Sequence, residues 1–565
     1  MQVVILCFMD KTKEEELVKD IKLRFEQLDE QRQKFIERWT TAQNYVSPVC
    51  YSWTDLDSIP STPKRYTSSP CDYLNTLVNG LVGYSISPSI QWFKLTLTNR
   101  ALLDLYRVKD WLEQVEDVLY GEFNRSNLYA QAPKIISDAA TIGHGILIEE
   151  EDFYEDKLKF NALRPNEIWL DINEYGDVDT VFRKYLITLK NAVAFFGLEN
   201  LHEDLREQYK VPAKHNSKIE ILCAVYPRTE RDEKNPDNKN KPYAVYFVDL
   251  NHNHIIKESG YDENPFIVFE WDQIPGLSYS NSPAINALPD IRYLDIANRT
   301  SMEICQTSAA PPMRAHSSLR NISVVPRGVV YVDSPDQILE PIRTGENYPI
   351  TLQIVEAIEQ RVKNWFNVDF FLSLQQKQGK MTATEVMELQ GEKSAVLSNL
   401  VVQLNSMLSK IIQRSFNLLW KKGKIPPPPE TLINQYGANM EVDFIGPLAQ
   451  QLKKYHTMGG IASAIQLARP IMEMFPNSAD YLNPDELMKR AMEGQAMPQA
   501  VIREDDDVQK IREERAKAQQ QAQMQAQQQA MSQSIMQNAN KLNAPIQDNS
   551  LLSALNEQLA GGMNG

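Results

Sequence analysis

The stretch from Thr382 to Lys422 predicts one long helix, and its length constrains what the rest of the chain can be. TATE at Thr382–Glu385 is a capping box, in which the Thr382 hydroxyl accepts from the N–H of Glu385 while the Glu385 side chain reaches back to the N–H of Thr382. Apolar residues follow at helical spacing: Leu397, Leu400, Leu404, Met407, Ile411 and Leu418. Gly423 and then Pro426–Pro429 end the pattern. At 1.5 Å per residue the helix is roughly 60 Å long, so we expect a spine and not one layer of a compact domain.

Two further helices flank a β-rich insert immediately before this spine. The first covers Ser282–Ala309, and a Pro-Pro pair stops it because proline lacks an N–H and clashes with the preceding turn. The insert, Met313–Pro349, is rich in valine, tyrosine and turn residues. The second helix covers Ile350–Leu374, and a loop around Gly379 joins it to the spine. The two helices therefore enclose an insert that is too short to bury a core of its own.

The first 280 residues predict an α+β region. Helical patterns cover Lys11–Tyr45, Asp72–Val82, Leu102–Asn127 and most of Ala132–Gly143, and strand or hairpin patterns cover Trp92–Leu97, the turn at Asn173–Gly176, Tyr243–Ile256 and Pro265–Trp271. The first helix should bury one face, made of Leu17, Ile21, Phe25, Leu28, Phe35 and Trp39. Gly143-His144-Gly145 lacks the spacing of a phosphate loop, so we expect a close approach of two backbones there.

The last part of the chain changes in composition. Met440–Ile445 predicts a strand, and short helices broken by prolines are expected at Ala462–Phe475 and Pro484–Glu493. From Arg503 the chain is rich in Gln and Ala with almost no aromatic residues, which fits either a long solvated helix or disorder.

Length and composition limit the function classes. A chain of 565 residues suggests about three or four domains. The net charge of −15 argues against tight wrapping of nucleic acid, although a polyanion could still slide past such a surface. Five scattered cysteines without a C-x-x-C indicate reduced thiols in a cytosolic setting. No run of about 20 apolar residues predicts a membrane span, and apolar Met1–Met9 is expected to be an N-terminal arm or to precede a true start at Met9.

Two groups of residues have some catalytic or metal-binding character. His252 and His254 could bind a metal, but they lie in a predicted turn, no third His or Cys lies nearby, and zinc takes three or four placed ligands. The acidic run Glu149–Asp152 could serve a metal-dependent nuclease, although a solvated strand end is the simpler interpretation. No nucleophile motif is present, so we expect no enzyme and no cofactor.

The order and the local sequence of these elements resemble the head-to-tail connecting (portal) protein family of short-tailed bacteriophages. The matching residues follow the chain from about residue 20 to 455: the Asp72–Gly83 helix with SPSIQWFKL after it, GDVDTVFRKY, SPAINALPDI, PPM, MTATEV, LLWKKGKIPPPP and VDFIGPLAQ. No single motif is specific, but their order and spacing are.

The resemblance implies a portal-protein fold with an α/β wing, a two-helix stem, a β-rich clip, a long spine helix, a helical crown and a C-terminal helical barrel or tail. The corresponding divisions are 1–280 for the N-terminal arm and wing, 281–310 and 350–374 for the stem helices, 311–349 for the clip, 375–381 for a tunnel loop, 382–455 for the spine and the rest of the wing, 456–503 for the crown and 504–565 for the Gln-rich barrel or tail.

The resemblance also implies a function in the virion. Family members form a ring, usually a dodecamer, at one capsid vertex, and double-stranded DNA passes through its channel during packaging and ejection. The clip meets the large subunit of the terminase and later the tail adaptor, while capsid and scaffolding proteins surround a ring assembled in the host cytoplasm. A separate ATPase would supply the energy, since no Walker A motif occurs in this chain.

Two sets of site residues follow from this frame. The tunnel-loop residues Gln375, Gln376, Lys377, Gln378 and Lys380 would project into the channel, where the two lysines could contact phosphates without reading sequence. In the clip, Val329, Val330, Tyr331 and Val332 would pair or pack between subunits.

Two other classes of protein stay open at this point. A scaffolding or coiled-coil adaptor protein could be built on the spine and the Gln-rich tail, and would form elongated small oligomers. A metal-dependent nucleic-acid enzyme could use the acidic run with His252 and His254, and would contain a divalent metal.

Overall fold

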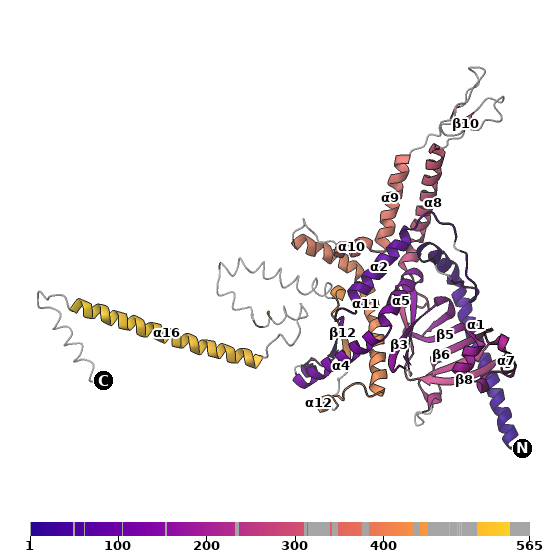
Figure 1. Cartoon of the computed structure of the whole chain (residues 1–565), viewed down its shortest axis with the longest axis horizontal. Helices are drawn as coiled ribbons and strands as arrows, with labels where there is room; N and C mark the ends of the chain where they lie inside the picture. Colours follow the sequence, from indigo (N-terminus) through magenta and orange to yellow (C-terminus); the bar gives the residue numbers. More distant parts are fainter. Residues whose placement is uncertain are drawn as a thin grey trace. The chain divides into compact units, whose positions relative to one another are not determined.

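The fold is given by a computed structural model that describes residues 2–48, 51–61, 63–103, 105–152, 155–231, 237–309, 313–314, 340–341, 348–375, 383–433, 440–449, 474, 483, 485, 488 and 505–542. Met1–Pro476 form one compact unit and Asn477–Gly565 a second, and the three or four domains suggested by length stay a prediction. Helices and antiparallel sheets share the first unit (Figure 1), which confirms the α+β class.

The first unit contains all the strands that the structure describes. Its helices are α1 (Gln2–Val46), α2 (Ser69–Ser85), α3 (Arg100–Leu103), α4 (Tyr106–Arg125), α5 (Leu128–Ile142), α6 (Leu189–Phe196), α7 (Glu203–Tyr209), α8 (Pro283–Ala309), α9 (Tyr348–Trp365), α10 (Val368–Gln375), α11 (Ala383–Lys421) and α12 (Glu430–Ile433), with short 3-10 turns η1 (Pro165–Glu167), η2 (Leu198–Asn200), η3 (Pro212–Lys214) and η4 (Asn238–Asn240). Its strands are β1 (Phe93–Leu97), β2 (His144–Asp152), β3 (Lys157–Leu163), β4 (Ile168–Ile172), β5 (Val178–Thr188), β6 (Lys218–Pro227), β7 (Tyr243–Asp249), β8 (His254–Tyr261), β9 (Phe266–Glu270), β10 (Met313–Arg314), β11 (Glu340–Pro341) and β12 (Met440–Phe444).

A five-stranded antiparallel sheet in the order β4-β5-β6-β7-β8 forms one side of the first unit. Both predicted hairpins are confirmed: β4 and β5 turn at Gly176, which has a φ of 87°, and β7 and β8 turn at Asn253, which has a φ of 54°. Successive residues of a strand point to opposite faces, so Leu222 and Cys223 of β6 belong to different hydrophobic clusters.

Helix α1 lies along one face of this sheet (Figure 1). It begins at Gln2 rather than at Lys11 as predicted. The predicted apolar face is confirmed, because Ile21, Leu28 and Trp39 are buried and the other three predicted residues are partly buried against the same clusters. The Arg32 guanidinium lies 4.1 Å from the Trp169 ring centroid, a cation–π contact in a buried setting.

The GHG motif is a packing site, as predicted. A Cβ on Gly143 would lie 2.0 Å from the carbonyl oxygen of Ser280, and one on Gly145 would lie 2.0 Å from that of Ile135. His144 between them is buried, and burial lowers the pKa of its imidazole to about 3. These glycines let α5 and the segment before α8 pack directly against β2.

The predicted spine is helix α11, and its last turn ends before Gly423, which has a φ of 68°. Three strands in the order β3-β2-β9 lie beside it, and the two-stranded β1–β12 sheet pairs Phe93 with Phe444. The largest hydrophobic cluster joins α2, α4, α5, α8, α9, α10 and α11 around these sheets. The spine therefore contacts several layers of the unit.

Some predicted helix boundaries are wrong. The helix predicted at Asp72–Val82 continues past Gly83 to Ser85, and the one predicted at Leu102–Asn127 is divided into α3 and α4. The helix predicted at Ile350–Leu374 is broken into α9 and α10 at Asn367, which has a φ of 50°. Asn tolerates this left-handed conformation better than most residues do, and the break redirects the chain so that Phe371 packs against α2.

The second unit contains helix α16 (Asp505–Leu542). Of the two alternatives for the Gln-rich region, the long solvated helix is the one found, since almost all its described side chains are exposed. An ion pair of 2.5 Å joins Arg512 Nη2 of α16 to Asp485 Oδ1 of the same unit. The predicted crown, 456–503, lies almost entirely outside the described residues.

Candidate functional site

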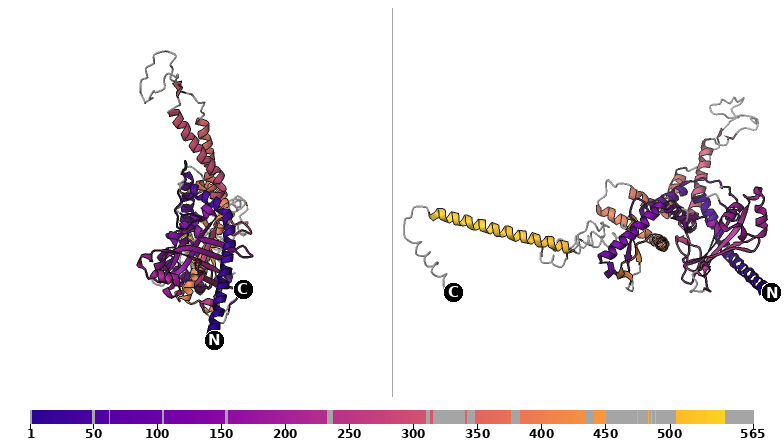
Figure 2. Two further views of the ribbon diagram at one scale, coloured as in Figure 1. Left: turned by 90° about the vertical axis from the view of Figure 1, so that its right-hand side faces the viewer. Right: turned by 60° about the horizontal axis from the view of Figure 1, so that its bottom comes forward.

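Helices α8 and α9 run side by side out of the first unit as a protruding pair (Figure 1, Figure 2). At their far end, β10 and β11 pair antiparallel, Met313 opposite Pro341 and Arg314 opposite Glu340. The chain therefore enters the insert after α8 through β10 and returns toward α9 through the neighbouring strand β11. The described part of this arrangement agrees with the predicted projecting helix pair, while the β-rich character of the insert between the helices stays a prediction.

Polar contacts fix the base of α8 in the first unit. Asp295 is buried, and its Oδ1 accepts hydrogen bonds from the N–H groups of Tyr66 (2.6 Å) and Thr67 (3.1 Å). One carboxylate therefore ties the loop before α2 to helix α8. A charge-assisted bond of this kind is stronger than a neutral one.

Helices α8 and α9 are also joined to each other. Arg361 Nη2 of α9 lies 3.0 Å from Asp290 Oδ1 of α8, and Trp365 Nε1 donates to Asp290 Oδ2 at 3.3 Å. The Tyr73 hydroxyl of α2 donates to Glu359 Oε1 of α9, and burial followed by this hydrogen bond raises the pKa of Tyr73. These contacts hold the pair at a defined angle to α2.

Apolar side chains remain exposed along both α8 and α9. Five of them keep 40 to 60% of their surface accessible: Tyr293, Ile296 and Met302 on α8, and Leu352 and Ile354 on α9. Large apolar surface exposed on a single chain is typical of a protein–protein contact.

Helix α10 carries the connection to the spine. Its Phe371 is fully buried, and a Cβ on Gly80 of α2 would lie only 2.2 Å from the Phe371 ring. Residues 376–382 then connect α10 to α11. The start of the predicted tunnel loop is therefore fixed by close packing between α2 and α10.

The predicted site residues lie mostly outside the described part of the chain. Gln375 is the last residue of α10, and Glu385 lies in the first turn of α11, but their side chains are not described. The remaining predicted site residues are outside the described ranges: Gln376, Lys377, Gln378, Lys380, Val329, Val330, Tyr331, Val332 and Thr382. The assigned roles of all eleven stay predictions.

The carboxylates of the acidic run Glu149–Asp152 contact different side chains of the same chain. Glu149 is fully buried, and its Oε1 accepts from the Ser415 hydroxyl at 2.6 Å. Tyr261 donates to Glu150 at 3.2 Å, and Lys159 lies 3.3 Å from Asp152. Glu149 therefore faces the spine and not solvent, so the interpretation of the run as a solvated strand end is wrong for this residue, although Glu150 is exposed and Glu151 and Asp152 are partly exposed.

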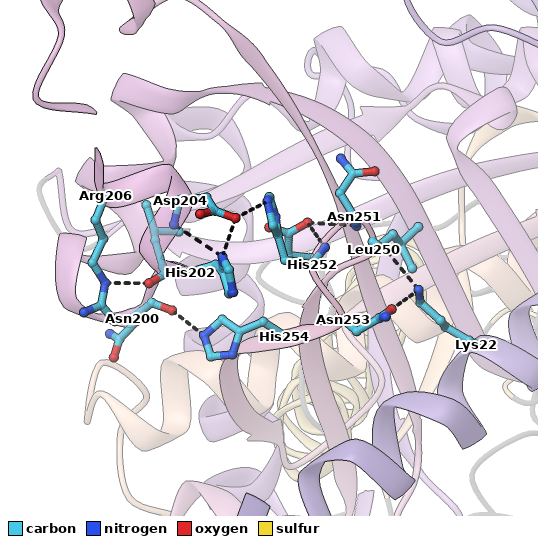
Figure 3. Close-up of polar contacts among 12 residues, drawn as sticks. Lys22, Asn200, His202, Asp204, Arg206, Leu250, Asn251, His252, Asn253 and His254 are labelled. Carbon is cyan, nitrogen blue, oxygen red and sulfur yellow. Dashed lines mark hydrogen bonds and ion pairs between the residues drawn. The ribbon is translucent and has the colours of Figure 1, made fainter. Parts of the chain in front are cut away.

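The prediction for His252 also needs correction. His254 does not join it, because its Nε2 lies 3.1 Å from the carbonyl oxygen of Asn200 and its Nδ1 lies 3.3 Å from Glu14. Instead His202 and Asp204 lie beside His252 (Figure 3), with the two imidazole centroids 4.5 Å apart. A third potential ligand is thus present in space, although it is 50 residues away in the sequence.

Comparisons with known proteins agree on one family. The family described as bacteriophage head to tail connecting protein matches residues 18–502. The portal protein of Salmonella phage epsilon15 is 27% identical over 526 residues, which cover 91% of this chain and 93% of that protein. A probable portal protein of Bordetella phage BPP-1 is 27% identical over 443 residues, covering 76% of this chain and 78% of the relative.

One solved structure, the neck of an empty GTA particle computed with C6 symmetry, aligns with 76% of this chain and 90% of its own chain. The TM-score is 0.35 and the identity 12%, so no conclusion about this fold rests on it.

The protruding helix pair and the long match define a protein that connects viral head and tail. The chain belongs to the bacteriophage head to tail connecting protein family, and the resemblance found in its sequence is confirmed. Its function is that of a portal protein. Among the described helices, none is both long and apolar enough to span a membrane.

Proposed function

We propose that twelve copies of this chain form a closed ring at one capsid vertex, with α8 and α9 as the stem. The observation that carries the proposal is the pair of stem helices, which leave apolar side chains such as Ile296 and Leu352 exposed on a single chain. Neighbouring stems in a ring would cover these side chains. Burial of apolar surface gives about 25 cal/mol per Å², which supports a stable contact repeated around the ring.

The β-rich insert would form the clip at the narrow end of this ring. The described β10–β11 ladder has only two residue pairs, and a two-stranded ladder of that size is not stable alone. Strands from neighbouring copies, including Val329–Val332, would complete it. The completed clip would dock the terminase large subunit during packaging and the tail adaptor afterwards.

The loop after α10 would line the channel through which double-stranded DNA passes. Close packing of Phe371 against Gly80 fixes the start of this loop, so that the same residues of each copy would form one ring. Lys377 and Lys380 would contact phosphates from this ring without sequence preference. The C-terminal helix α16 would belong to a barrel or tail beyond the crown.

Native mass spectrometry of the full-length protein tests this proposal. We expect a closed oligomer for the unchanged chain and for Tyr175→Asp, which alters an exposed residue in the β4–β5 turn. Ile296→Asp places a charge on the stem surface and should reduce the oligomer to smaller species. An oligomer that Ile296→Asp leaves intact would contradict the assignment of the stem as the contact.

A further inference from the structure

Two segments of the first unit meet at the outer end of the β7–β8 hairpin. One is the hairpin turn with His252, and the other is the start of α7, where His202 is the N-cap residue and Asp204 lies in the first turn (Figure 3). The excursion that carries η2 and α7 lies between β5 and β6 in the chain. Side chains from two separate connections of the sheet therefore converge.

The three side chains have the separations of ligands around one ion. Asp204 Oδ2 lies 3.5 Å from His252 Nε2 and 3.4 Å from His202 Nδ1, and the three ligand atoms all lie within 4.8 Å of one another. His202 Nδ1 also accepts a long cap bond of 3.4 Å from the N–H of Asp204, which an ion would replace. Zinc–nitrogen bonds of about 2.0–2.1 Å in a tetrahedron place neighbouring ligands about 3.3 Å apart. Two of the three distances between ligand atoms are therefore close to the spacing in a tetrahedral zinc site.

The His252 imidazole is oriented for metal binding by a fourth residue. Asp249 is buried, and its Oδ2 lies 2.7 Å from His252 Nδ1. If Nδ1 donates its proton to this carboxylate, Nε2, which lies 3.5 Å from Asp204 Oδ2, is the nitrogen left to bind an ion. A carboxylate that holds the second nitrogen of a histidine is the usual outer partner of a metal ligand.

Both segments are held in place without an ion. His254 contacts the carbonyl oxygen of Asn200, and Arg206 Nε donates to that of Leu201 at 2.6 Å. Lys22 of α1 donates to the carbonyl oxygen of Leu250 at 2.9 Å and also contacts Asn253. An ion would therefore enter a site whose backbone is already positioned.

We propose that His202, Asp204 and His252 bind one divalent transition metal ion of the zinc type. Two imidazoles and one carboxylate suit zinc better than magnesium or calcium, which prefer oxygen ligands. Water takes the fourth position, since Asp204 is exposed to solvent. The ion links the β7–β8 turn to α7 and so fastens the outer end of the five-stranded sheet.

Zinc titration of the full-length, tag-free protein after treatment with a chelator tests the site. We expect one zinc ion per chain, a higher Tm with zinc, and visible absorption bands of a tetrahedral centre when cobalt is added. His202→Asn keeps a good N-cap residue but removes the imidazole. This variant and His252→Gln should each bind zinc at least tenfold more weakly.

The matched control is His254→Gln, which changes a neighbouring histidine of the same hairpin that the site does not use. It should bind zinc as the unchanged protein does. Absence of a saturable site would overturn the proposal and leave a group of hydrogen bonds and ion pairs. Equal loss in His254→Gln and His252→Gln, or unchanged affinity in His202→Asn, would overturn it as well.

Discussion

The Ser415 hydroxyl of the spine donates a hydrogen bond of 2.6 Å to Glu149 Oε1 of β2, and neither residue has exposed surface. Arg414 adds two bonds of 3.3 and 3.2 Å to the carbonyl oxygen of Glu149. The spine helix and the three-stranded sheet are thus joined at a buried polar point. The carboxyl group at this point should respond to pH.

The contribution of Glu149 to the stability of the protein should fall with rising pH. Burial is the largest cause that raises the pKa of this carboxyl from 4.5 to about 8, so the folded state holds a proton that the unfolded state has lost. Between these values the group reduces the free energy of unfolding by about 1.4 kcal/mol per pH unit. Glu149→Gln stays neutral and should remove this share of the dependence in denaturant unfolding measured from pH 5 to 8, while Glu116 and Asp138, whose pKa values burial raises to about 7, keep theirs.

Comparing Glu149→Gln with the unchanged protein isolates the contribution of the Glu149 carboxyl group. His144 acts in the opposite direction, since burial lowers its pKa to about 3, but it is the same in both proteins. Glu150→Gln, on an exposed neighbour, is the control and should keep the dependence of the unchanged protein. The assignment is wrong if Glu149→Gln and the unchanged protein lose stability in parallel.

Gly80→Ala should destabilise the first unit by about 1–3 kcal/mol, because the added methyl group would overlap the buried Phe371 ring. Gly83→Ala is the matched control in the same helix, where a Cβ meets nothing within 4 Å. It should be neutral or stabilise by up to about 1 kcal/mol through helix propensity. Thermal unfolding of both variants checks this, and equal changes in Tm would contradict the packing of α10 on α2.

Asp295→Ala should loosen the loop before α2, since the N–H groups of Tyr66 and Thr67 lose their acceptor. The expected cost is about 1–3 kcal/mol, with faster hydrogen exchange at these two amides. Asp290→Ala removes the partly exposed pair with Arg361 and should cost less than about 1 kcal/mol. Unchanged exchange at Tyr66 and Thr67 in Asp295→Ala would refute the role of the carboxylate.

Lys377→Ala combined with Lys380→Ala should impair DNA packaging or retention in phage particles while leaving ring assembly intact. The physical reason is the loss of positive charge from the loop that we propose lines the channel. Lys109→Ala with Lys190→Ala removes the same charge from exposed positions in the first 280 residues and should package normally. Normal packaging and retention by the loop variant would mean that these lysines are not the DNA contact.

Sequence patterns correctly predicted the structural elements that depend on residues close together in the chain. The turns at Gly176 and Asn253, the close packing at Gly143 and the length of the spine all follow from glycine, asparagine and apolar spacing, and all are confirmed. The break at Asn367 was missed because the apolar pattern continues across it, and tertiary packing of Phe371 decides the direction of the chain.

Long-range contacts could not be predicted in the same way. Strand β1 pairs with β12 more than 340 residues later, and His202 meets His252 through an excursion whose path no local pattern gives. The buried state of Glu149 depends on Ser415, 266 residues away. The residue types indicated which hydrogen bonds or metal contacts were possible at these positions. Only the three-dimensional fold shows which residues contact each other.

Electron microscopy of the purified full-length protein, with class averages viewed along the particle axis, tests the central claim most directly. We predict closed rings with a central hole and twelve-fold symmetry, formed by neighbouring stems. Monomers or rods at every concentration and salt condition would contradict a ring built from this chain, and a closed ring of another symmetry would contradict the number twelve.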